Sequence, residues 1–223
     1  MDKTALDQYE EIVTDALKSC SAKLRKSFKT AFIQLMILYM VLPRKINFTQ
    51  MGRYSDSSEQ RFRQLFEREF DWTQFNLFLM RQRFGESVRK AIAIDASYIS
   101  KSGKKTPYIG KFWSGCASQV KRGLEILGIG IVDIDCRDCM MLRAEQTPNK
   151  AYLEKQGEDY NLVDRYLDVL RKYKDKLLGI TRYVVADAWF SKAKFVNDAC
   201  LMGFHVISRL RDDAALWYSH NGV

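Results

Sequence analysis

Along the chain, the spacing of apolar residues changes from a helical period to a strand period between residues 83 and 90. Before that point, apolar side chains recur every three or four positions, which is typical of helices packed on one face. The pattern predicts an amphipathic helix within residues 3–29, a buried helix at 31–42 that ends before Pro43, two short helices near 47–54 and 57–70, and a further helix at 72–82.

After residue 90, short apolar runs rich in Ile and Val alternate with helical stretches. Such runs are typical of buried strands, and the order predicted is β-β-β-α-β-α-β, an α/β fold with a mixed sheet. Strands are expected at 90–99, 124–133, 139–145, 181–187 and 204–210, and helices at 159–178 and 192–202.

The two short helices at 47–54 and 57–70 are separated by a tight turn, and the second is rich in Arg. This arrangement is similar to a helix-turn-helix, in which the second helix enters the DNA groove. Arg61 and Arg63 are then candidate DNA contacts. A helical packing unit without any DNA role has the same pattern, so both interpretations stay open.

Composition narrows the classes of protein. The 223 residues are 47% hydrophobic and 28% charged, with 3 Pro, which excludes a disordered chain. The formal net charge is +9 and both halves are basic, which fits a polyanionic partner as well as simple solubility charge. Five cysteines with one CxxC and no second metal-binding pair favour neither a disulfide framework nor a zinc site. No export signal and no membrane-spanning run is present, so a cytoplasmic protein is expected.

Two aspartates occupy equivalent places. Asp95 follows the apolar run AIAI, and Asp187 follows YVVA. A carboxylate in a buried strand is costly unless it is paired or binds a metal. If the two strands are neighbours, both carboxylates meet at one edge of the sheet and could hold Mg²⁺. The plainer alternative is that each Asp ends its strand and caps a turn.

Basic residues surround this predicted edge. The stretch from Asp95 to Glu125 contains no other acid but several Lys and aromatic residues, as expected of a loop that binds a phosphate backbone. A solvated loop is the alternative. The candidate DNA contacts are Lys101, Lys104, Lys105 and Lys111 in this stretch, and Arg209 and Arg211 after the last strand.

Two motifs in this region resemble a known family. The runs AIDAS (93–97) and YVVADAWFSK (183–192), with the three-strand block between them, are similar to insertion-sequence DDE transposases of the group numbered four. The resemblance covers most of the chain. It implies a ribonuclease-H-like mixed sheet, with Asp95 and Asp187 as the first two catalytic, metal-binding acids, and Mg²⁺ or Mn²⁺ as cofactor.

The resemblance also implies a biological setting. Residues 1–88 would be a helical DNA-binding or assembly domain, and 89–223 the catalytic domain. The expected partners are the transposon ends and target in double-stranded DNA, with a homodimer on DNA, no membrane, and a place at the bacterial nucleoid.

One departure bears on activity. The family places its third acid, a Glu, on a helix well after the second Asp, whereas no Glu follows Glu158 here, and the later acids Asp198, Asp212 and Asp213 lack its context. The expectation is a catalytic domain missing its C-terminal part, so whether this chain is itself an enzyme is left undecided. The alternatives are a non-catalytic DNA-binding or inhibitory transposase fragment, and a different ribonuclease-H-like nuclease such as a resolvase.

Overall fold

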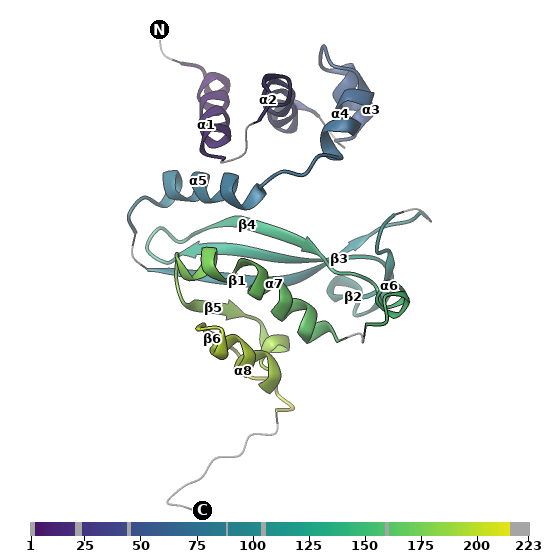
Figure 1. Cartoon of the computed structure of the whole chain (residues 1–223), viewed down its shortest axis with the longest axis vertical. Coiled ribbons are helices and arrows are strands. Elements are labelled where there is room, and N and C mark those ends of the chain that lie inside the picture. The colour runs from purple at the N-terminus through teal and green to yellow at the C-terminus, as the bar shows by residue number, and fades with distance from the viewer. Residues whose placement is uncertain are drawn as a thin grey trace, which may run out of the picture. The chain divides into compact units, whose positions relative to one another are not determined.

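The chain forms two compact units, Met1–Gly85 and Glu86–Val223, in a computed structural model. The structure describes residues 3–20, 24–43, 46–87, 89–103, 106–158 and 161–214. Each unit is described by itself below, and Figure 1 labels their elements.

The first unit is entirely helical in its described part. Its helices are α1 (Ala5–Ser19), α2 (Lys26–Val41), α3 (Phe48–Arg53), α4 (Glu59–Phe66) and α5 (Trp72–Phe84). Side chains at the residue before four of these helices accept a backbone N–H of the first turn and so fix where the helix begins. These caps are Thr4, Asn47, Ser58 and Asp71.

The prediction of one helix within residues 3–29 is wrong in one respect. Helix α1 ends at Ser19, Cys20 has an extended backbone, and the next helix begins only at Lys26. Apolar spacing alone did not reveal the break, because the short connection carries no Pro or Gly.

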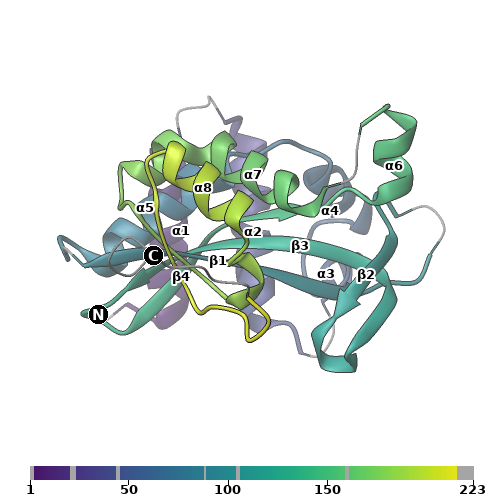
Figure 2. The ribbon, with the colours of Figure 1, turned by 90° about the horizontal axis from the view of Figure 1, so that it is seen from below.

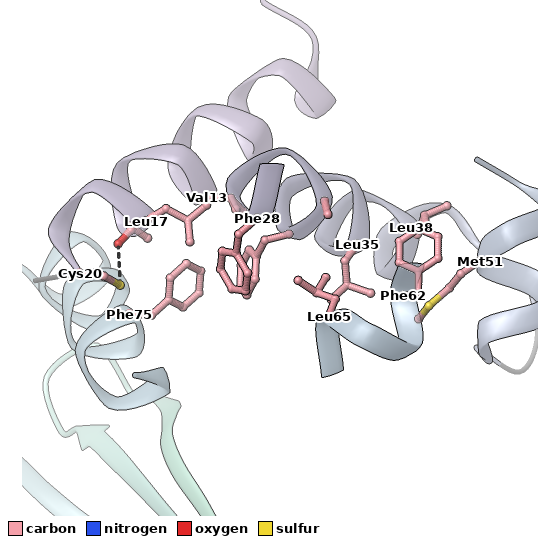
Figure 3. Packing of buried hydrophobic residues seen from close by; sticks show 13 residues of the cluster. Val13, Leu17, Cys20, Phe28, Leu35, Leu38, Met51, Phe62, Leu65 and Phe75 are labelled. Atoms are coloured by element: carbon pink, nitrogen blue, oxygen red, sulfur yellow. Dashed lines mark hydrogen bonds between the residues drawn. The ribbon is translucent and has the colours of Figure 1, made fainter. Parts of the chain in front are cut away.

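An aromatic cluster holds the helical unit together. Phe28, Phe32 and Phe75 are buried, and the Phe32 ring centroid lies 5.4 Å from that of Phe75 in an edge-to-face contact. In Figure 3, Phe28 and Phe75 lie towards one end of the cluster, and Phe62 lies against Met51 at the other end. Each fully buried side chain of this size contributes about 1.5–3 kcal/mol, so this cluster is the main stabilising contact of the unit.

The second unit is a six-stranded sheet with helices. Its strands are β1 (Lys90–Ser100), β2 (Gly110–Ser114), β3 (Gln119–Asp133), β4 (Asp138–Gln146), β5 (Tyr183–Ala186) and β6 (His205–Ser208). Its helices are α6 (Lys150–Lys155), α7 (Leu162–Leu178) and α8 (Ala193–Leu201), with short 3₁₀ turns η1 (Gly115–Ala117) and η2 (Ala188–Phe190). Figure 2 shows α7 and α8 together on one face of the sheet.

The sheet order is β2-β3-β1-β5-β6, with β4 also paired to β3. Strands β1, β3 and β4 are antiparallel, whereas β1, β5 and β6 are parallel. The sheet is therefore mixed, with β1, β3 and β4 antiparallel and with β5 and β6 added in parallel through helices. This topology confirms the predicted ribonuclease-H-like class. The structure adds β2, which lies in the stretch predicted to be a loop.

Strand β2 and the start of β3 form a two-stranded ribbon, here called the arm (residues 110–123). Gly123 sets its position, because it pairs with Ser100 of β1 on one side and with Gly110 of β2 on the other. A Cβ at Gly123 would lie 2.5 Å from the Tyr98 ring, which is too close for any side chain.

Replacing Gly123 with Ala is therefore expected to lower the free energy of unfolding by about 1–3 kcal/mol, the usual cost of overpacking. The matched control is Gly115→Ala in the same arm, where a Cβ would meet nothing within 4 Å. Urea unfolding followed by circular dichroism measures both. An equal, small effect of the two substitutions would contradict the close packing at Gly123.

Candidate active site

Parallel pairing of β1 with β5 brings the two sequence-predicted aspartates together. Ile94 of β1 is the partner of Ala186 of β5, and the next residue on each strand is Asp95 and Asp187. Neighbouring strands lie about 4.8 Å apart, and the two aspartates follow the last paired residues and line one cavity, so their carboxylates lie side by side.

Asp187 also caps the turn that follows it. Its Oδ1 accepts the backbone N–H of Trp189 at 3.0 Å, at the start of η2. Its backbone carbonyl accepts the Ser208 hydroxyl at 2.7 Å, which fixes the end of β6 against the same turn. The turn-capping role considered for Asp187 is thus present, and it uses only one of the two carboxylate oxygens.

Both aspartates are themselves exposed. Residues alternate between the faces of a strand, and Ile94 is the neighbour that enters the core, at 3% exposure. Even so, partial burial raises the pKa of Asp95 above its ordinary value, and the negative charge of Asp187 raises it further. The Ala96 backbone N–H opposes this shift.

A cavity of about 380 Å³ adjoins the pair. Asp95 and Asp187 line it together with aromatic side chains and one further acid, and the residues used below are Trp113, Glu125, Tyr166 and Trp189. A cavity lined by acidic and aromatic side chains suits a ligand that brings a cation to the acids and a flat apolar surface to the rings.

Glu125 was not among the sequence candidates. It is 6% exposed on β3, and its Oε1 accepts the Tyr166 hydroxyl of α7 at 2.7 Å. The Tyr166 ring lies 5.4 Å from the rings of both Trp189 and Phe190. This contact links the helix to the turn that carries Asp187. The sequence could have indicated the burial of Glu125, since this residue lies in the same alternating inward pattern along β3 as Leu127 and Ile129.

The candidate basic residues differ in their surroundings. Lys101 and Lys111 are exposed, and Lys101 lines a surface hollow with Arg122. Lys104 and Lys105 lie outside the described residues. Arg209 and Arg211 line a shallow hollow with Ala188, next to Asp187, and are paired with Asp212 at 3.1 Å and Asp213 at 2.6 Å.

In the helical unit, the two candidate arginines of α4 point to different partners. Arg63 donates to Glu59 and its guanidinium lies 4.9 Å from the centre of the Phe48 ring. The Nη2 of Arg61 donates to the Ser27 carbonyl at 3.4 Å, and both arginines are exposed. Helices α3 and α4 are consecutive and a short connection joins them, so the DNA contact by Arg61 and Arg63 stays a prediction.

Two kinds of feature are absent from the residues that the structure describes. Among the residues that the structure describes, no three His, Cys, Asp or Glu side chains gather in a group able to hold a metal ion. No helix in the described part is long and apolar enough to cross a membrane.

Comparison with known proteins identifies the family. Residues 25–223 match the family model of the DDE superfamily endonucleases, so the chain belongs to this family. No curated protein sequence is significantly similar to the chain.

Solved structures with some similarity include the Mos1 mariner paired end complex with Mn, at 11% identity and a TM-score of 0.28. The Mos1 transposase paired-end complex with left transposon end is 13% identical, also with a TM-score of 0.28. The chain covers 65% and 60% of those chains, and 88% and 84% of its own length is matched. The chain thus spans less than two thirds of either relative, and the family match carries the assignment.

Because Asp187 contributes to the raised pKa of Asp95, replacing Asp187 with Asn is expected to lower that pKa towards its ordinary value. Carboxyl-carbon NMR titration of Asp95 in the metal-free protein measures the shift. The control is Asp198→Asn on α8. An unchanged Asp95 titration in the Asp187 variant would show that the two carboxylates do not interact.

Proposed function

We propose that this chain is a DNA transposase of an insertion sequence, which cleaves and transfers strands at transposon ends with the help of divalent metal ions. The observation that carries the proposal is that Asp95 and Asp187 directly follow the paired parallel segments of β1 and β5, in a chain of the DDE superfamily endonucleases.

The side chains present fit a divalent cation. Partial burial raises the pKa of Asp95 and the charge of Asp187 adds to this shift, so a bound cation would stabilise the two charged carboxylates. Oxygen ligands suit Mg²⁺ and Mn²⁺. When bound, such ions supply Lewis-acid activation of the attacking oxygen and stabilisation of the leaving one. Asp95 and Asp187 would hold the metal.

The chain's own part in the reaction is to position DNA. Lys101, Lys111, Arg209 and Arg211 would contact the phosphate backbone around the carboxylates, a contact that is independent of sequence. The Asp212 and Asp213 pairs of the two arginines are exposed and therefore weak, so phosphates can replace them.

The remaining parts of the proposal concern assembly. The helical part of the chain, residues 1–88, would bind DNA through Arg61 and Arg63 or hold two copies together, and residues 89–223 would form the catalytic domain. The protein would work as a homodimer on double-stranded DNA at the nucleoid of a bacterial cell.

A second candidate is a DNA-binding form of the transposase that does not cut on its own. The observation that favours it is that Asp95 and Asp187 have, in the described ranges, no third acid that completes a metal-binding group. The two candidates differ in one measurement, metal-dependent nicking of a duplex that carries the transposon end, because only the first predicts product.

Replacing either Asp95 or Asp187 with Asn is expected to weaken Mn²⁺ and Mg²⁺ binding at least tenfold, while duplex DNA binding stays nearly unchanged. The reason is that each substitution removes one of the two carboxylates that would bind the metal but leaves every Lys and Arg that would bind DNA. Isothermal titration calorimetry with the metal alone and fluorescence anisotropy with DNA measure the two properties. Asp198→Asn is the control, and metal binding that survives both site variants would sink the assignment.

Replacing Lys101 and Lys111 together with Ala is expected to weaken duplex binding and to flatten its salt dependence, by roughly 0.9 in logarithmic slope for each phosphate that the variant no longer neutralises. Binding at a series of salt concentrations measures this slope. Lys174→Ala on α7 is the control. A slope equal to that of the unchanged protein would place these lysines away from the DNA.

A further inference from the structure

One face of the arm gathers features that lower the stability of the isolated protein. Lys111 of β2 is the direct partner of Arg122 on β3, and Trp113 is the partner of Val120. Partners in an antiparallel ribbon share a face, and so do residues two apart on one strand. The four side chains therefore form a single surface, called here the arm face.

The arm face is unfavourable without a partner. Like charges directly opposite each other repel, as Lys111 and Arg122 do. Trp113 is 60% exposed and Val120 is 57% exposed, so the largest side chain of the ribbon and its cross-strand neighbour lie in water. A two-stranded ribbon folds without a like-charge pair or an exposed Trp. Residues that oppose local stability are expected at functional sites.

The reverse side of the arm is anchored. Phe112 is 4% exposed and Ser114 is 5% exposed. The Tyr98 hydroxyl of β1 donates to the Arg122 carbonyl at 2.6 Å, and Arg122 Nη2 donates to the Gly103 carbonyl at 3.3 Å. These contacts hold the arm to β1, the strand that carries Asp95, and Figure 2 shows β2 beside β3 in the sheet.

Trp113 connects this face to the aspartate pair. Its side chain lines the same cavity as Asp95 and Asp187. A ligand group in contact with the Trp113 ring would therefore lie next to the atoms that the proposed reaction uses.

The chemistry of the arm favours a nucleic-acid strand as the occupant. The arm contains three cations, Lys111, Lys121 and Arg122, and no acidic residue. Proteins bind unpaired DNA by combining cations with an exposed aromatic ring, because the cations pair with the phosphates and the bases stack on the ring. An acidic peptide would match the charge but would leave the ring without a flat partner.

We propose that the arm face binds the DNA strand beside the aspartate pair, with Trp113 stacked on an unpaired nucleobase and with Lys111 and Arg122 on the flanking phosphates. The inference rests on the proposed function and adds to it a preference for duplexes that are locally unpaired where the chain acts. Trp113 is a positioning residue in this scheme.

The test compares two labelled duplexes of one sequence, fully paired and with a short single-stranded gap, by fluorescence anisotropy. The unchanged full chain is expected to bind the gapped duplex about tenfold more tightly, within the range of one stacked base. Trp113→Ala should remove this preference and change binding of the paired duplex less than twofold, whereas Trp113→Phe should keep most of it. The aromatic control is Tyr183→Ala on β5, a side chain of similar exposure at 52% that does not line the cavity.

The outcomes separate this inference from the proposed function. If Trp113→Ala keeps the gap preference while the aspartate variants lose metal binding, the arm inference is overturned and the proposed function stands. If Trp113→Ala instead changes self-association in sedimentation without altering the gap preference, the arm face binds a second copy, and the inference is equally overturned. If metal binding is unaffected by the aspartate variants but the gap preference depends on Trp113, the arm inference stands and the metal-dependent function does not.

Discussion

The pairing of β1 with β5 is the contact on which the site depends. Ile92 and Val184 are partners in this pairing and neither is exposed to solvent. Their burial contributes about 1.5–3 kcal/mol each and fixes the register. A shift of one residue would turn every side chain of the strand to the other face, so the same apolar contact that stabilises the sheet places Asp95 beside Asp187. Two like charges repel at this distance, and the hydrophobic burial of the preceding residues on both strands opposes that repulsion.

Helix α7 extends the constraint from the strands to the turn after them. Leu167, Leu170 and Leu177 are buried along its inner face. From the same face, Tyr166 donates to Glu125 and packs on the η2 turn that begins at Asp187. The helix thus joins the strand beside the cavity to the turn that carries the second aspartate. The Tyr166 hydroxyl gives the buried Glu125 carboxylate a hydrogen-bond donor, and a buried polar group needs such a partner in an otherwise apolar core.

The sequence predicted most strands well because each central strand contains an apolar stretch rich in Ile or Val, and an Asp directly after two of these stretches indicated that the two acids lie together. It did not predict β2, since the five residues Gly110–Ser114 contain two exposed large or charged side chains and appear as part of a basic loop. Their strand conformation comes from pairing with β3, a long-range contact that local propensity does not encode. The exposure of Asp95 could have been predicted from strand alternation, because Ile92 and Ile94 already occupy the inward positions. The Glu125–Tyr166 contact needed the pairing of strand with helix.

The second unit has two pairs of like charges, one negative and one positive, near the same cavity. Asp95 and Asp187 place two negative charges side by side, and Lys111 and Arg122 place two positive charges opposite each other on the arm. Trp113 links these groups, because it belongs to the arm face and lines the cavity of the aspartates. In the proposed complex, a phosphodiester strand with its divalent cation would relieve both repulsions at once, since the cation would contact the carboxylates and the phosphates would contact the arm. A base would cover the exposed Trp113 ring, so that the two repulsions and the exposed ring would become three contacts with one ligand.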